Sequence, residues 1–212
     1  MTKKILVALV ITISLYAQDD SQTNSSQETI SVPKPTPSQA IIESLTHPII
    51  QADLFEGDNL DSNFILNMIF HYEGNIDASK IFLKHSTNPT IKKITQNIIK
   101  DRKTQMEELQ ALLPELETRK KLYSPKEVTL FNQQIKADWE TMLQTINETP
   151  LKNYINDDYV SSLIPYYQWA VDTSKQILKY TQNETIQVIA QHIIQTQEKE
   201  IESLQALPKR KN

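Results

Sequence analysis

The chain repeats itself after 95 residues. The segment 64–112 aligns without a gap on 159–207, and more than a third of the aligned positions are identical. Average residue usage would give roughly 6–8% identity by chance. Related units in one chain can pack about a pseudo-two-fold axis, as identical subunits do. The duplication therefore predicts one domain built from two similar halves.

Each half is predicted to be a helical hairpin. The chain has only two glycines, and its prolines stand mainly where a helix would begin or end, which favours an all-helical protein with short connections. Apolar residues at helical spacing predict helices over 61–86 and 89–112, with Asn88 as the N-cap between them. The second half repeats this pattern over 157–182 and 184–207. Two hairpins with one apolar face each are expected to bury these faces on each other as an antiparallel four-helix bundle.

The remaining segments are assigned from their composition. Ser124-Pro125-Lys126-Glu127 has the spacing of a capping box and opens a predicted connecting helix that ends near 147. A weaker helix is predicted over 38–45. The expected single domain thus covers 58–208, with hairpins at 58–117 and 151–208 and the connecting segment at 118–150.

The N-terminus is typical of a secretory signal peptide over residues 1–17. Lys3 and Lys4 precede an apolar run over 5–15 that is too short to span a membrane, and Ala17 is the expected cleavage residue. An uncleaved signal anchor is the alternative. Residues 18–57 are polar and proline-containing, which predicts a tether. We therefore expect a bacterial protein that is periplasmic or secreted, with no membrane span after cleavage.

Charge and cysteine content exclude several classes of function. Removing Lys3 and Lys4 changes the formal net charge from −4 to −6, and a mildly acidic domain without a basic stripe is not expected to bind nucleic acid. No cysteine is present, which excludes disulfides and thiolate metal sites. The pattern leaves the oligomeric state open, and a protein partner of unknown identity is compatible with it.

A motif at the centre of each half resembles a known family. The motif reads Met68-Ile69-Phe70-His71-Tyr72-Glu73-Gly74 in the first half and Leu163-Ile164-Pro165-Tyr166-Tyr167-Gln168-Trp169-Ala170 in the second. Both resemble the MIPHHxxA hallmark of the ferritin-like family catalogued as domain of unknown function 305. Ile193-Ile194 with Gln197, Glu200, Ile201 and Leu204 is similar to that family's second signature, where the first half has Arg102, Gln105 and Met106. The resemblance covers residues 58–112 and 157–207.

The resemblance implies a ferritin-like bundle that is often exported and, in some members, is associated with copper or other metals. The paired histidines of the family motif would be the metal ligands, yet this chain keeps only His71 and has Tyr166 at the equivalent place. No Glu-x-x-His pair occurs in the bundle, and Arg102 stands opposite Gln197 in the alignment. We therefore expect a degenerate metal site, no cofactor and no enzymatic activity.

Copper is the alternative cofactor. Met68 and His71 lie three residues apart on one helical face, and Met106 on the partner helix could join them, since thioether and imidazole suit copper. The competing interpretation is that both methionines fill the core and that His71 is hydrogen-bonded, for example to Gln105 or Glu107.

Two further contacts are predicted between the repeats. Glu200 interrupts an apolar row and needs a partner if it is buried, and Arg102 is the expected partner within a polar network that includes Gln105, Gln197 and Tyr166. Gly74 stands inside a helix and aligns with Trp169. We expect the Trp169 ring to fill the space above Gly74 and to fix the register of the two hairpins.

Overall fold

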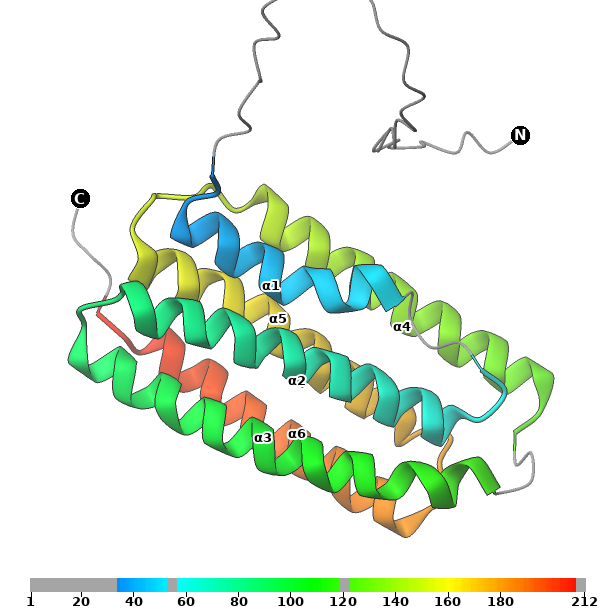
Figure 1. Cartoon of the computed structure of the whole chain (residues 1–212). Coiled ribbons are helices and arrows are strands. Elements are labelled where there is room, and N and C mark those ends of the chain that lie inside the picture. The colour runs from blue at the N-terminus through cyan, green and yellow to red at the C-terminus, as the bar shows by residue number, and fades with distance from the viewer. Residues whose placement is uncertain (1–33, 53–56, 119–122, 209–212) are drawn as a thin grey trace, which may run out of the picture. The chain divides into compact units, whose positions relative to one another are not determined.

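The computed structural model describes residues 34–52, 57–118 and 123–208, which form six helices and no strand (Figure 1). The helices are α1 (Pro37–Ala52), α2 (Leu60–His85), α3 (Pro89–Thr118), α4 (Pro125–Glu148), α5 (Ile155–Ile177) and α6 (Glu184–Gln205). The prediction of an all-α fold is confirmed, whereas the ferritin-like order of the bundle helices stays a prediction. The predicted signal peptide and residues 18–33 of the predicted tether lie outside the described residues.

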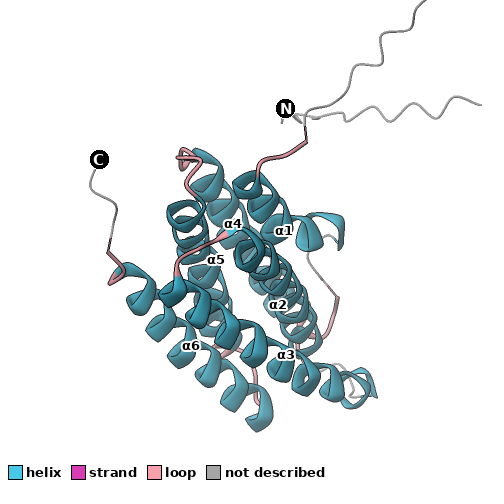
Figure 2. Cartoon of the chain, turned by 60° about the vertical axis from the view of Figure 1, so that its left-hand side comes forward, coloured by secondary structure: helices cyan, strands magenta, loops and turns pink. Residues whose placement is uncertain are grey.

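Both hairpins turn through the same local chemistry. Helices α2 and α3 form the first hairpin, α5 and α6 form the second, and α2 packs against α5 (Figures 1 and 2). The hydroxyls of Ser86 and Thr181 each accept a hydrogen bond from the backbone N–H two residues later, at 3.1 Å. The side chains of Asn88 and Asn183 then accept from the first-turn N–H groups of α3 and α6. Each turn therefore satisfies the free donors at the start of its second helix.

Helix α1 corrects the predicted extent of the tether. Instead of a short helix over 38–45 in a polar segment, α1 spans Pro37–Ala52 and packs on α2 and α5. Ile41 and Leu45, one turn apart, are fully buried, and the Ser38 hydroxyl donates to the buried Asp158 carboxylate at 2.6 Å. The domain therefore begins before residue 58. In the sequence, the two apolar residues were too small a signal to distinguish a packed helix from a tether.

Helix α4 opens as predicted and packs on α5. The Ser124 hydroxyl accepts from the Glu127 backbone N–H at 3.3 Å, and the Glu127 carboxylate accepts from the Ser124 N–H at 2.7 Å, so the capping box is present. Its apolar face is buried through Phe131, Ile135, Trp139 and Met142. Shifted by 95 residues, α1 corresponds to 132–147 within α4. Helix α1 therefore covers α2 as α4 covers α5, so that each half contributes three helices (Figure 2).

The ends of two helices differ from the predicted ones. Helix α3 continues past residue 112 to Thr118, because Leu116 is buried and its carbonyl accepts a hydrogen bond from the Asn59 side chain at 2.9 Å. Helix α5 ends at Ile177 instead of near 182, and a turn over 178–180 follows. The two repeats therefore differ at the C-terminal ends of both hairpin helices.

The predicted contact between Gly74 and Trp169 is wrong. A Cβ atom at Gly74 would lie 2.7 Å from the Tyr166 hydroxyl, 2.9 Å from the Ser44 carbonyl oxygen and 3.1 Å from that of Leu45. The absent side chain thus lets α1 and Tyr166 approach the α2 backbone. Sequence alignment could not reveal this, because α1 lies outside the repeated segment and no pattern predicted that it would cross α2.

We expect Gly74→Ala to destabilise the protein. Alanine gains about 1 kcal/mol over glycine inside a helix. The two α1 carbonyls are backbone atoms that move only with the helix, so the overpacking cost of about 1–3 kcal/mol should exceed that gain. Urea denaturation of both proteins measures the difference. An alanine variant as stable as the native chain would show that α1 does not lie against Gly74.

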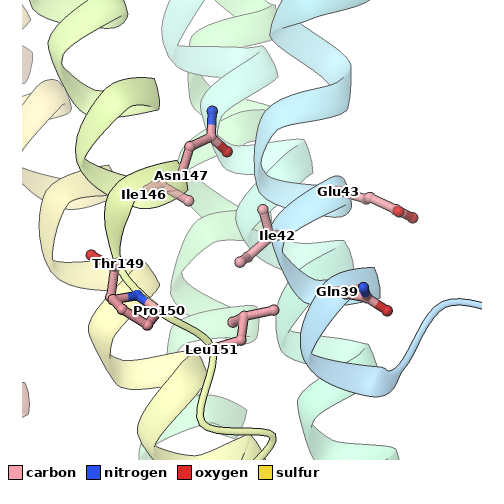
Figure 3. Close-up of a pocket in the computed structure, with 8 residues that line it drawn as sticks. All are labelled: Gln39, Ile42, Glu43, Ile146, Asn147, Thr149, Pro150 and Leu151. Atoms are coloured by element: carbon pink, nitrogen blue, oxygen red, sulfur yellow. The ribbon is translucent and has the colours of Figure 1, made fainter.

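A shallow hollow of about 420 Å³ separates α1 from the C-terminal end of α4 (Figure 3). Ile42 on α1 and Leu151 beyond α4 point into it, whereas Glu43 points away (Figure 3). Glu43 is the only ionisable residue that lines the hollow.

Candidate functional site

The two motif helices meet through equivalent residues at the centre of the bundle. The His71 imidazole on α2 stacks on the Tyr166 ring of α5, with centroids 4.1 Å apart and planes 15° from parallel. The Tyr166 hydroxyl donates to the His71 carbonyl oxygen at 2.7 Å. Both residues are fully buried. The residue pair that aligns in the sequence therefore also pairs in space, as expected near a pseudo-two-fold axis.

Arg102 reaches into the same centre from α3. Its side chain is fully buried, and its guanidinium carbon lies 5.1 Å from the Tyr72 ring centroid and 5.3 Å from that of Tyr167. These two tyrosines are again equivalent in the repeats. The faces of aromatic rings attract a cation, most strongly where water is absent. The guanidinium is thus held between one aromatic residue from each motif helix.

The charge of Arg102 is balanced by Glu200 on α6. A guanidinium nitrogen pairs with the Glu200 carboxylate, and another donates to the Gln105 side chain at 2.9 Å. The Glu200 side chain is 24% exposed, so the pair extends from the core to the edge of the bundle. Three members of the predicted polar network, Arg102, Gln105 and Glu200, therefore lie in direct contact.

Burial and ion pairing shift the pKa values of both Arg102 and Glu200. Burial lowers the pKa of the Arg102 guanidinium, but the Glu200 carboxylate and the two tyrosine rings outweigh it, and the net pKa is raised. Burial raises the pKa of the Glu200 carboxyl, and Arg102 offsets only part of that effect. Burial also raises the pKa of Tyr72 to about 12. Arg102 therefore carries a fixed positive charge in the core, next to tyrosines that stay neutral.

His71 is a neutral imidazole in this setting. Burial, followed by the positive charge of Arg102, holds the pKa of His71 well below its usual value, and the nearby Gln197 amide opposes them only in part. Neither ring nitrogen of His71 makes a hydrogen bond of standard geometry with the described residues, and the same holds for the Gln197 amide. The predicted hydrogen bonds from His71 to Gln105 or Glu107 are not found.

Of the predicted copper ligands, His71 lies among aromatic rings, and the two methionines belong to the apolar core or its edge. The rings around His71 are Tyr72, Tyr166, Tyr167 and Trp169. Met68 is fully buried in the apolar core and Met106 is partly buried against it. Among the residues that the structure describes, no group of three or more histidine, cysteine, aspartate or glutamate side chains could hold a metal ion.

A comparison with protein families identifies the domain that contains this centre. A family model described as "Domain of unknown function (DUF305)" matches residues 61–208. The chain belongs to this family. No curated protein and no solved structure matches the chain. The function of the family is unknown, so the match supplies neither a substrate nor an activity.

The DUF305 match contains every residue of the buried centre. The motif helices α2 and α5 supply the aromatic rings, while α3 and α6 supply the ion pair and the Gln197 amide. None of the described helices is long and apolar enough to cross a lipid bilayer. The DUF305 domain of this chain is thus a helical bundle with a polar, aromatic-lined centre.

Sequence reasoning missed three members of this centre. Tyr72 and Tyr167 form the faces on which Arg102 lies, and their identity in both repeats was the signal that could have indicated them. The third is Trp139 on α4, which packs edge-on against Trp169 with centroids 5.6 Å apart. The repeat alignment does not include that helix, so it carried no signal for Trp139.

Proposed function

We propose that this protein is an exported, non-enzymatic binding or interaction module in which an internal cation, Arg102, takes the place of a metal ion. The observation that carries the proposal is the buried guanidinium between Tyr72 and Tyr167. A second cation beside it would be repelled in a medium that screens charge poorly. In this proposal the interior of the bundle stabilises the fold, and the surface of the bundle binds the partner.

The charge balance at the centre supports this proposal. One positive guanidinium faces one carboxylate, Glu200, and the remaining polar groups there are neutral tyrosine, histidine and amide side chains. A divalent metal would add two positive charges where the Glu200 carboxylate already pairs with Arg102. Buried charges are tolerated only when they are paired or ligated.

Titration with Cu(I) and with Cu(II) tests the proposal. The purified chain is expected to show no stoichiometric binding of either ion, and His71→Ala should behave as the native protein does. An equivalence point at one copper per chain that disappears in His71→Ala would overturn it. His192 is exposed on α6, so His192→Ala is the matched control and should leave any titration curve unchanged.

One observation favours the alternative of a copper-binding protein that uses His71 with Met68 or Met106. Neither imidazole nitrogen of His71 makes a hydrogen bond of standard geometry with the described residues, and the low pKa leaves one nitrogen lone pair able to act as a ligand. The positive charge of Arg102 counts against it. The same titration separates the two proposals.

Export is proposed from the sequence of residues 1–17 alone, with a periplasmic or secreted destination. The intact mass of the protein recovered from its host provides the test. A chain that begins at Gln18 supports export with cleavage. A cytoplasmic chain that retains residues 1–17 would contradict it.

A further inference from the structure

An open groove lies beside the first turns of α5 and the end of α6, and we call it the α5–α6 groove. It has a volume of about 450 Å³, and its apolar lining includes Tyr154, Val160, Ile164, Leu204 and Leu207. Val160 and Ile164 are half-buried, and Tyr154 is 38% exposed. Asn88 and Ile91, from the start of the first hairpin's second helix, close one end.

The equivalent surface of the first repeat is covered. Ile65 and Ile69 of α2 align with Val160 and Ile164 of α5, but their side chains are only 0% and 5% exposed. Asp61 is fully buried, whereas Asn156, at the equivalent place, is half-buried and lines the groove. The two repeats therefore share this surface but not what covers it.

The end of α3 and the residue Tyr123 provide the cover in the first repeat. The Leu116 carbonyl accepts from the Asn59 side chain at 2.9 Å, and the Tyr123 hydroxyl donates to the Asp61 carboxylate at 2.8 Å. Both Leu116 and Tyr123 are buried. An apolar helical turn followed by an aromatic hydroxyl thus lies over the first turns of α2.

The second repeat has no such segment among its described residues. Helix α6 ends at Gln205, whose equivalent Gln110 lies well inside α3. At the positions that align with Leu113 and Leu116, the second repeat has Pro208 and Lys211, which cannot supply two apolar side chains. Among the described residues, this surface therefore stays open as the groove.

We propose that the α5–α6 groove binds an amphipathic helical segment of a partner protein that carries two apolar residues three positions apart and a tyrosine beyond them. The chain's own first repeat is the template for this chemistry, because Leu116 and Tyr123 are buried there and bond to Asn59 and Asp61, which align with the groove residues Tyr154 and Asn156. An apolar helical face laid into a hydrophobic groove is a common mode of peptide recognition. This inference rests on the proposed function only in assigning recognition to the surface.

A synthetic peptide with the sequence of residues 104–124 is the probe, since it contains Leu113, Leu116 and Tyr123. Fluorescence anisotropy of the labelled peptide is measured against the full chain. We expect saturable one-site binding that weakens at least tenfold in Val160→Glu. Val188→Glu is the matched control, because Val188 is 64% exposed on α6 and does not line the groove. Its affinity should stay within twofold of the native value.

A peptide with aspartate at both leucine positions should not bind. Circular dichroism checks that Val160→Glu folds, and Tyr154→Ser at the rim serves as a second variant, with an expected loss of at least threefold. Absence of saturable binding, or binding that both groove variants leave unchanged, would overturn the proposal. So would a concentration-dependent dimer in sedimentation that Val160→Glu dissociates, because a second copy would then occupy the groove. Copper titration is independent of these results, so failure here leaves the metal question unaffected.

Discussion

Replacing Arg102 with methionine is expected to lower the free energy of unfolding by about 3 kcal/mol. The substitution keeps a long, unbranched side chain in the core but removes the cation that lies between Tyr72 and Tyr167. It also leaves the Glu200 carboxylate, which is mostly buried, without its partner. Breaking a buried pair from one side costs about 3–5 kcal/mol, and the partial exposure of Glu200 places this case at the lower end.

Two further variants distinguish the buried pair from an ordinary one. The double variant Arg102→Met with Glu200→Leu should be less destabilised than Arg102→Met, since no unpaired charge remains. Lys175→Ala removes a surface pair in which Lys175 and Glu198 are both about half-exposed, and should cost at most about 1 kcal/mol. Chemical denaturation measures the native protein, these variants and the single variant Glu200→Leu. Equal losses in Arg102→Met, Glu200→Leu and the double variant would contradict the paired-charge account.

The second large effect is the destabilisation that His71 contributes as the pH falls from 7 to 5. His71 is held neutral in the folded state, with its pKa well below the usual value of about 6.5. Between the lowered folded-state pKa and about 6.5, the unfolded chain binds a proton at this residue more readily than the folded chain. Acid therefore favours unfolding in this range, with a limiting slope of about 1.4 kcal/mol per pH unit.

The variant His71→Phe isolates this contribution, because phenylalanine keeps an aromatic ring against Tyr166 and cannot be protonated. Its free energy of unfolding should change less with pH than that of the native protein, whatever its absolute stability. Glu200 has a raised pKa and acts in the opposite direction in both proteins, so the difference between their slopes reports on His71 alone. Parallel stability curves from pH 7 to 5 would show that His71 binds its proton equally in the folded and unfolded chains, which would contradict the lowered pKa.

The sequence predicted the scaffold because its signals are local or repeated. The two hairpins, the asparagine caps at 88 and 183 and the capping box at Ser124 each follow from short patterns whose physical cause acts within one turn. The pair Arg102 and Glu200 could be anticipated because a charged residue interrupted an apolar row. A single sequence reveals positions where a residue is energetically unfavourable among its neighbours, such as a charge in an apolar row.

What the sequence could not predict depends on contacts between segments that do not repeat. The space above Gly74 was assigned to the Trp169 ring, but helix α1 and Tyr166 occupy it. The stack of His71 on Tyr166 needed the relative rotation of α2 and α5, which periodicity does not determine. The α5–α6 groove became visible only when the burial of equivalent residues was compared.

Metal analysis of the protein purified from its own host tests the central claim most directly, because no metal is then supplied by the experimenter. Inductively coupled plasma mass spectrometry should find far less than one copper ion or other transition metal ion per chain, since Arg102 provides the positive charge at the centre. One metal ion per native chain, absent from His71→Ala prepared in the same way, would contradict the account.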